Sequence, residues 1–289
     1  MFPSLNNAKT VARTCVITLI AAIVTVPATA EDPQPDGKPL WELGVAGGGG
    51  YLPDYPASDE NRFKGIALPY AVYRGEILRA GDKGIVRGRF LKNDRLEFDL
   101  SADGSFPADS DDNDAREGMD DLDFLLEVGP RLQVVLARAA RDAKIELELP
   151  VRAAFSADFF EIKYRGVLTH PKISYQHNDF LGTGIQMKLS AGPIFATEEL
   201  HDYFYEVNAN DVRAGRPLFD AEPGYLGSEF QLGLSRSITE NIRVFGGVQL
   251  GYFEGAANED SPLFRDELTV GAGIGLVWSF FQSEQRVKD

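Results

Sequence analysis

The stretch Leu268–Phe280, LTVGAGIGLVWSF, alternates between two kinds of side chain along its whole length. Every second residue, beginning with Leu268, is apolar, and the residues between them are mostly glycine, serine or threonine. A period of two is typical of a β-strand, whose successive side chains point to opposite faces of a sheet. The stretch is about twice as long as the usual strand of a globular domain. It therefore predicts a long strand with one apolar face and one face of small and polar residues.

The same alternation recurs through most of the chain. A tilted strand needs about 9–11 residues to cross a bilayer, and several alternating segments reach that length. Lipid cannot satisfy an open sheet edge, so such strands must close into a ring. The sequence therefore predicts an all-β fold, a transmembrane antiparallel β-barrel of about twelve strands (range about 10–14). We expect these strands at residues 41–51, 64–74, 76–80, 84–91, 95–104, 124–136, 143–155, 162–175, 182–195, 224–237, 241–254 and 267–280.

Aromatic residues gather at the ends of the expected strands, where a girdle at each membrane interface would place them. An even number of strands leaves both chain ends on one side of the membrane, which we expect to be the periplasmic side. The long connections then face outward, and the short turns face the periplasm. The expected girdle is Trp41, Tyr51, Phe195, Tyr225, Tyr252, Trp278 and Phe280; the long connections are 105–123, 196–223 and 255–266, and the turns include 137–142 and 176–181.

The first 30 residues have the pattern of a secretory signal peptide. Two positive charges precede an apolar run over residues 15–26, which ends in Ala28-Thr29-Ala30. The run is shorter than the roughly 20 residues that a membrane-spanning helix needs. We therefore expect a signal peptide at 1–30, a periplasmic lead at 31–40, the barrel at 41–280 and a periplasmic tail at 281–289. The single cysteine, Cys15, would leave with the signal peptide, which excludes disulfides from the exported chain.

The composition excludes two broad classes of protein. With 44% hydrophobic residues the 289-residue chain is too apolar to be disordered. Its formal charge of −15 would repel nucleic-acid phosphates, so we expect no nucleic-acid partner. Together with the expected signal peptide, the composition predicts an exported, acidic protein without cysteine.

The polar faces of the strands carry charges of both signs, which alternation places in the barrel lumen. Mixed charges in a barrel of about twelve strands should pair and fill space, whereas a porin of high conductance needs a wider ring with segregated charge. We therefore interpret these residues as a structural ion-pair network, with a selective pore as the alternative. The expected network is Arg87, Arg89, Arg95, Glu97, Asp99, Glu127, Arg131, Lys144, Glu146, Glu148, Arg152, Lys188, Glu229 and Arg243.

Catalytic, cofactor and metal sites are not expected. The strand map places His170 on a lipid-facing strand, His177 in a periplasmic turn and His201 in an outer loop, so the three histidines cannot converge, and there is no G-x-S-x-G motif. The acidic run from residue 109 to 123 begins like an EF-hand loop but lacks the glycine at its sixth position. The glycine run 47–50 has no helix or Lys-Ser/Thr after it, so we expect it to ease curvature at a barrel rim rather than to hold phosphate.

Several short motifs, in this order and spacing, are similar to those of the MipA/OmpV family. The resemblance covers about residues 40–280, and its implied fold is an outer-membrane β-barrel of Gram-negative bacteria. The outer membrane lipid is then the surrounding partner. The motifs are Leu68-Pro69-Tyr70, Gly118-Met119-Asp120-Asp121-Leu122, Glu127-Val128-Gly129-Pro130, Tyr203-Phe204-Tyr205-Glu206-Val207, Ala214-Gly215-Arg216-Pro217 and Glu259-Asp260-Ser261-Pro262-Leu263.

The resemblance also implies a function. The member that gives the family its name, MltA-interacting protein, is a scaffold that joins a lytic transglycosylase to a penicillin-binding protein at the murein layer. We therefore expect a non-enzymatic scaffold for murein-degrading and murein-synthesising enzymes. The alternatives are a narrow pore for small solutes and a surface adhesin built from the outer loops. One departure is that nine residues follow Phe280, whereas outer-membrane barrels usually end on an aromatic residue.

Overall fold

The computed structural model describes residues 37–74, 78–80, 87–92, 95–158 and 161–287. The expected signal peptide and most of the expected periplasmic lead lie outside these residues. The described chain consists of strands and one short helix. The elements are β1 Lys38–Pro39, β2 Trp41–Pro53, β3 Asn61–Arg74, β4 Leu78–Ala80, β5 Arg87–Lys92, β6 Leu96–Ser105, β7 Phe124–Ala140, β8 Ala143–Ala157, β9 Ile162–Thr169, β10 Lys172–Phe180, β11 Ile185–Ala196, α2 Glu198–Tyr205, β12 Gly224–Ser237, β13 Ile242–Tyr252, β14 Leu268–Gln282 and β15 Arg286–Val287.

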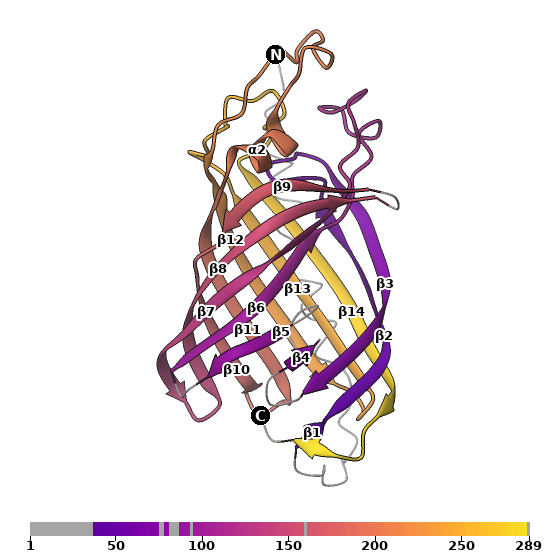
Figure 1. The fold of residues 1–289 in the computed structure, drawn as a ribbon, viewed down its shortest axis with the longest axis vertical. Helices are drawn as coiled ribbons and strands as arrows, with labels where there is room; N and C mark the ends of the chain where they lie inside the picture. The colour runs from indigo at the N-terminus through magenta and orange to yellow at the C-terminus, as the bar shows by residue number, and fades with distance from the viewer. Residues whose placement is uncertain (1–36, 75–77, 81–86, 93–94, 159–160, 288–289) are drawn as a thin grey trace, which may run out of the picture. The chain divides into compact units, whose positions relative to one another are not determined.

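The strands β2 to β14 form one antiparallel sheet that closes on itself (Figure 1). The last strand, β14, pairs with the first, β2, over most of their lengths. On the other side of the ring, β9 and β10 lie end to end in one position, because β9 pairs with the second half of β8 and β10 with its first half. Counted over the described residues, the ring therefore has twelve strand positions. The predicted all-β barrel of about twelve strands is confirmed.

The connections divide the barrel into two unlike ends. Turns over residues 141–142, 181–184 and 238–241 lie at one end, which we call the short-turn end. Connections over residues 106–123, 197–223 and 253–267 lie at the other, the long-loop end. Antiparallel alternation around the ring produces this division, and it is the one that the sequence pattern predicted.

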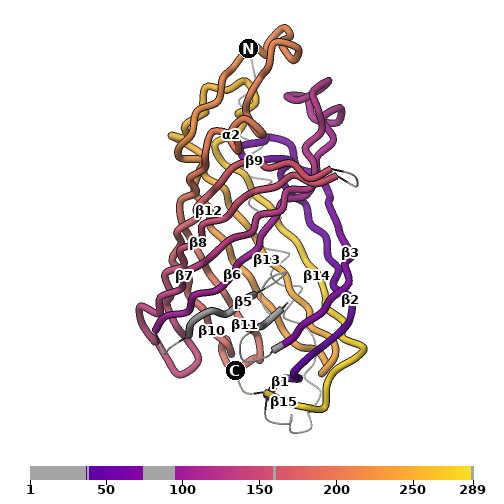
Figure 2. Tube along the Cα trace, viewed as in Figure 1, coloured from indigo at the N-terminus to yellow at the C-terminus, as the bar shows by residue number. Residues whose placement is uncertain are grey.

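Both ends of the described chain lie at the short-turn end, where β1 pairs with β15 (Figure 2). Strand β14 continues through Gln282, two residues beyond the expected end of the last strand. Leu40 N also donates a hydrogen bond to the carbonyl of Gln285. Part of the stretch that follows Phe280 is therefore strand.

Two expected turns were placed wrongly. Strand β7 runs through Ala140, so the turn that follows is only Arg141 and Asp142 rather than residues 137–142. Strand β10 runs through Phe180, so His177 lies in a strand and not in a turn. The turn that follows begins at Leu181, whose backbone is left-handed with φ of 56°. In both cases the strands extend beyond the part that shows alternation in the sequence.

The expected lipid-facing position of His170 was also wrong. A β-bulge makes Arg165 an extra residue on β9, because Ala154 pairs with Gly166 while Phe155 pairs with Tyr164. Gly166 accommodates the bulge with φ of 104°, which glycine adopts without steric cost. A bulge shifts the alternation by one residue. His170 therefore points inward and is only 6% exposed.

The outer face of the barrel carries large exposed apolar side chains. Phe63 is 80% exposed and Ile162 73%, which a protein surrounded by water would avoid over a whole surface. Of the expected girdle residues, Trp278 and Phe280 lie near the short-turn end, and Tyr51 and Tyr252 near the long-loop end. Six of the seven are exposed, and Tyr225 is half-buried against Phe195 with the ring centroids 5.7 Å apart.

The main hydrophobic core lies in the long loops rather than in the barrel. The sequence pattern did not predict helix α2, which begins after Thr197 with two acidic residues in its first turn. Its buried side chains Leu200 and Phe204 join a cluster drawn from loops and strand ends all around the ring. This cluster therefore extends across the barrel mouth. We name the segments 54–58, 106–123, 197–223 and 253–267 the loop cap.

Hydrogen bonds between distant segments hold the loop cap together. Tyr205, which is fully buried, donates its hydroxyl proton to the carbonyl of Pro56 at 3.0 Å. The Tyr55 hydroxyl donates to the carbonyl of Leu263 at 2.7 Å, and the Ser261 hydroxyl donates to the carbonyl of Tyr205 at 2.7 Å. Among the described residues, no helix is long and apolar enough to cross a membrane.

Truncating one cap side chain tests whether the cap is a packed unit. Leu200 is 1% exposed, so Leu200→Ala should destabilise the cap by about 2–5 kcal/mol through lost contacts and a cavity. We expect the 197–223 segment to become sensitive to protease while the barrel stays folded in a gel-shift assay. Leu218→Ala is the matched control, because Leu218 lies in the same loop and is 64% exposed. Equal protease sensitivity of the two variants would contradict a packed cap.

Candidate functional site

The barrel lumen has two unlike walls. Strands β6, β7, β8, β10 and β11 present charged side chains to the interior, several of them almost completely buried. Strands β13, β14, β2 and β3 present mainly glycine and apolar residues to the same interior. The charged wall and the glycine-rich wall face each other across the lumen, and together they make up the candidate site.

One network at the charged wall is centred on two fully buried carboxylates, Asp99 and Glu148. Arg131 donates to both oxygens of Asp99, at 2.7 and 3.0 Å, and to Glu148 at 3.3 Å. Lys188 donates to the other oxygen of Glu148 at 2.6 Å, and Gln133 donates to Asp99 at 3.0 Å. Two charge-assisted bonds in parallel hold Arg131 in one orientation. The network thereby links the neighbouring strands β6, β7 and β8 and reaches across β10 to β11.

A second group lies closer to the long-loop end. Arg152 donates one hydrogen bond to Glu127 at 3.1 Å, one to Asp103 at 3.2 Å and one to the Ser101 hydroxyl at 3.1 Å. Near the short-turn end, Lys144 and Glu146 of β8 form a separate pair. Their closest approach is 2.7 Å. Buried charges are stable only when paired and hydrogen-bonded in this way.

The remaining residues of the expected network are placed differently. Arg95 is exposed just before β6, and Glu97 is half-buried on β6. Glu229 accepts a hydrogen bond from the Gln249 amide at 2.5 Å, and Arg243 is half-buried on β13. The side chains of Arg87 and Arg89 lie outside the described part of the structure.

Several polar residues of the lumen were not predicted from the sequence. Asp103 is two positions from Ser101 and four from Asp99, so period-two counting on β6 would have placed them together. Lys64 of β3 pairs with Asp54 at 3.1 Å, and Asp54 has a fully buried side chain. This pair had no such signal, because Asp54 follows the end of β2 and reaches Lys64 only after the chain turns back.

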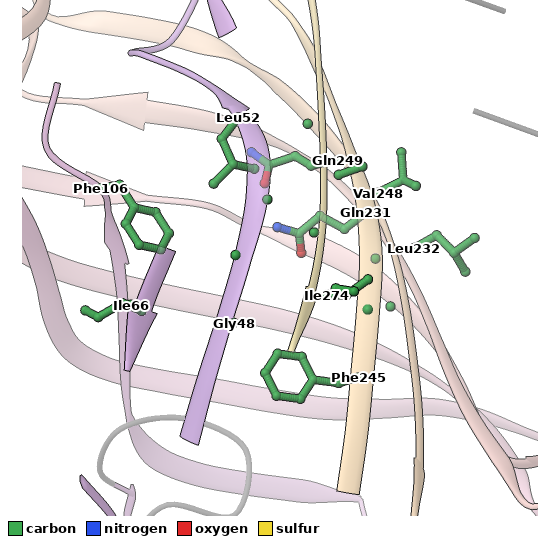
Figure 3. Close-up of a pocket in the computed structure, with 18 of the residues that line it drawn as sticks. Gly48, Leu52, Ile66, Phe106, Gln231, Leu232, Phe245, Val248, Gln249 and Ile274 are labelled. Atoms are coloured by element: carbon green, nitrogen blue, oxygen red, sulfur yellow. The ribbon is translucent and has the colours of Figure 1, made fainter. Parts of the chain in front are cut away.

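The glycine-rich wall borders a cavity of about 580 Å³ (Figure 3). Ile66 and Phe106 point into it from one side, and Phe245 from the other, while Leu232 and Val248 point away. The expectation that residues 47–50 lie at a barrel rim was wrong. They lie in the middle of β2, where Gly48 is opposite Gly275 and Gly50 is opposite Gly273 of β14.

A second cavity of about 330 Å³ lies beneath the loop cap. Tyr55, Phe204 and Phe253 line it on the cap side, and Glu127 and Glu229 on the lumen side. Three residues line both cavities and so form the partition between them. These residues are Leu52, Phe106 and Gln249.

The three histidines lie in three different environments. His170 is buried between β9 and β10, and His177 lies on β10. His201 is buried in α2, where its Nδ1 lies 2.8 Å from the Asn258 amide nitrogen and its Nε2 lies 3.3 Å from the carbonyl of Gly224. Burial lowers the pKa of His201, which favours its neutral form.

The acidic run over residues 109–123 makes contacts within its own loop and with the 197–223 segment. Asp121 accepts a hydrogen bond from the Ser110 backbone at 2.7 Å, and Glu117 pairs with Arg213 at 2.7 Å. In the described ranges, no group of three or more histidine, cysteine or carboxylate side chains is arranged to hold a metal ion.

Among the carboxylates of α2, Asp202 has the largest shift in pKa. Burial, together with the nearby carboxylates of Glu206, Glu198 and Asp220, raises the pKa of Asp202 to about 6. Its Oδ1 atom is buried and has no hydrogen-bond partner among the described residues. The folded loop cap therefore favours the neutral acid.

Removing the central arginine tests the charged network. Arg131→Met would leave Asp99 and Glu148 buried with fewer partners, and we expect it to destabilise the barrel by about 3–5 kcal/mol. Urea titration followed by gel shift measures the change. Asp99→Asn in the same background should recover part of the loss, because it removes the unpaired charge. Arg213→Met, in the exposed pair with Glu117, is the matched control with an expected cost below about 1 kcal/mol. Equal losses of unfolding free energy for Arg131→Met and Arg213→Met would show that the buried network contributes no more than the exposed pair.

The pKa of Asp202 predicts a pH dependence for the loop cap. Because the pKa is higher in the folded cap than in an unfolded chain, its stabilising contribution is complete below about pH 4 and is lost as the pH rises through about 6. Asp202→Asn should remove most of this dependence, leaving the part due to Glu206, whose pKa burial also raises, and should slow hydrogen exchange of α2 at pH 7 by roughly tenfold. Glu222→Gln, at an exposed carboxylate of the same loop, should leave it unchanged. An unaltered pH profile in Asp202→Asn would exclude Asp202 as the source.

Three solved structures show what the fold is similar to. A bacterial polysaccharide outer membrane secretin is 10% identical, with 85% of this chain and 100% of that chain covered and a TM-score of 0.40. The Salmonella typhi outer membrane phospholipase dimer with bound calcium is 10% identical, covering 86% and 94%, with a TM-score of 0.35. The Pseudomonas putida toluene transporter TodX is 11% identical, covering 91% and 72%, with a TM-score of 0.23. At these identities the likeness concerns the fold alone.

The family comparison is more specific. No curated protein matches the chain. The family model described as MltA-interacting protein MipA matches residues 45–280, which is nearly the whole barrel together with its loops. The resemblance inferred from the sequence motifs is thereby confirmed. The chain is an outer-membrane β-barrel and belongs to the MltA-interacting protein MipA family.

Proposed function

We propose that this barrel is a non-enzymatic scaffold that holds a lytic transglycosylase, and with it a penicillin-binding protein, at the inner surface of the outer membrane. The observation that carries the proposal is the family match over residues 45–280, because the family is described by its interaction with MltA. The proposal includes removal of residues 1–30 on export, and it places the short-turn end in the periplasm.

The short-turn end offers a surface on which such a partner could bind. Leu181 is 80% exposed at the first position of its turn and has the left-handed backbone noted above. This conformation is strained for a branched residue, and exposure gives it no compensating apolar contacts. The turn is nevertheless well defined, since Asp179 accepts a hydrogen bond from the Gly184 backbone at 2.8 Å. A partner that buried Leu181 would gain apolar contact on a rigid site.

The lumen supports a structural rather than a conducting role for the charged wall. Its buried carboxylates are satisfied by arginine and lysine from neighbouring strands, as described for Asp99 and Glu148. The loop cap extends across the long-loop end. A narrow pore or a surface adhesin, the two alternatives, has no comparable single observation in its favour.

Crosslinking followed by affinity purification tests the proposal. Tagged wild-type barrel, purified from crosslinked envelopes, should enrich a lytic transglycosylase above the level obtained with an unrelated barrel. Leu181→Asp should reduce that enrichment at least several-fold, because a charge at the centre of an apolar contact is costly. Leu218→Asp, an exposed leucine at the long-loop end, is the matched control and should have no effect. Recovery of no murein enzyme above the control barrel would overturn the scaffold assignment.

A further inference from the structure

The cavity beside the glycine-rich wall owes its space to missing side chains. A Cβ atom on Gly50 would come within 2.5 Å of the Ala272 carbonyl oxygen, and one on Gly48 within 2.8 Å of the Ile274 carbonyl oxygen. Glycine at these positions allows β2 and β14 to lie close together with no side chain on the lumen face. The resulting cavity of about 580 Å³ falls within the 300–1,000 Å³ range of small-molecule sites.

Apolar side chains line this cavity without being covered. Ile66 is 37% exposed, Leu68 45% and Phe245 42%, although all three lie on lumen-facing positions of their strands. Apolar surface exposed to lumen water is unfavourable, and covering it releases free energy in proportion to its area. By contrast, the opposite wall of the lumen carries paired charges. The apolar surface therefore points to an apolar occupant.

The polar groups at the cavity restrict the charge of the occupant. Lys188 reaches the edge of the cavity, but its ammonium is bound to Glu148 at 2.6 Å. The Gln249 amide donates to Glu229, and the oxygen of Gln231 lies 3.4 Å from the Ser190 hydroxyl. The Lys188 charge is thus matched within the protein, and the other polar groups that face the cavity are the amides of Gln231 and Gln249 and the Ser190 hydroxyl. Such groups suit a hydroxyl or carbonyl oxygen better than an ion.

We infer that this cavity is a binding chamber for a small uncharged molecule that has an aromatic ring or a short alkyl chain and a single hydroxyl or carbonyl group. The partition formed by Leu52, Phe106 and Gln249 separates the chamber from the second cavity beneath the loop cap. That second cavity is apolar at Tyr55 and Phe204 on its cap side and carries Glu127 and Glu229 on its lumen side, so the apolar surface of the chamber ends at the partition. The inference is independent of the scaffold function.

Equilibrium dialysis with 4-bromobenzyl alcohol tests the chamber in the full barrel embedded in nanodiscs. We expect saturable binding above the partition into empty nanodiscs. Gly233→Leu should weaken it at least tenfold, because Gly233 lines the chamber and a Cβ atom there would meet nothing closer than 3.9 Å. Ala67→Leu adds the same side chain at an exposed position of β3 between Ile66 and Leu68, on the opposite face, and should bind like the wild type. Binding equal to empty nanodiscs, or undiminished in Gly233→Leu, would overturn the inference.

A crystallographic experiment keeps the inference testable if Gly233→Leu does not fold. Wild-type crystals grown with 4-bromobenzyl alcohol should show an anomalous bromine peak among Ile66, Phe106 and Phe245. A bromine peak only outside the chamber, or no peak at a concentration that saturates binding in dialysis, would place the binding elsewhere and refute the chamber.

Discussion

The structure depends on one constraint, which is that a strand in lipid has no water to satisfy its backbone groups. Every strand of the sheet must therefore have a neighbour on each side. Closure meets this requirement where β14 pairs with β2 and where the end-to-end strands β9 and β10 pair with β8. Once the ring is closed, the outer face must be apolar, and all specific polar chemistry is confined to the lumen and the two ends.

The lumen is then divided by composition rather than by shape. The charged wall joins neighbouring strands through Arg131, Glu148 and Lys188, and the glycine-rich wall lets β2 and β14 lie close together. The two walls differ in how far their side chains fill the lumen. Long charged side chains fill the space on one side, and their absence leaves space on the other. A binding chamber and a structural network can thus exist side by side in a single barrel.

Much of the fold could be predicted from period-two alternation, because strand phase in a barrel is set by the contrast between lipid and lumen. The prediction failed at His170, since a bulge at Arg165 depends on pairing with β8 and leaves no local signature apart from Gly166. The helix α2 was missed because its stability comes from distant cap residues. The pairing of Arg131 with Asp99 follows from adjacent strands, whereas the pair of Lys64 with Asp54 requires the geometry of a loop. The glycine run of β2 was expected to ease curvature at a barrel rim, because the sequence alone does not show which strands border a cavity.

The loop cap and the barrel are packed for two different solvents, water around the cap and lipid around the barrel. The cap buries Leu200, Tyr205 and Leu263 as a water-soluble domain does, by excluding water from an apolar centre. The barrel does the reverse, with lipid against its apolar side chains and polar groups inside. The cap is complete only when loops from strands all around the ring come together, because its core combines residues of several of them. Apolar residues are therefore required at the centre of the cap but on the outer face of the barrel, and the two parts are free to diverge at different rates.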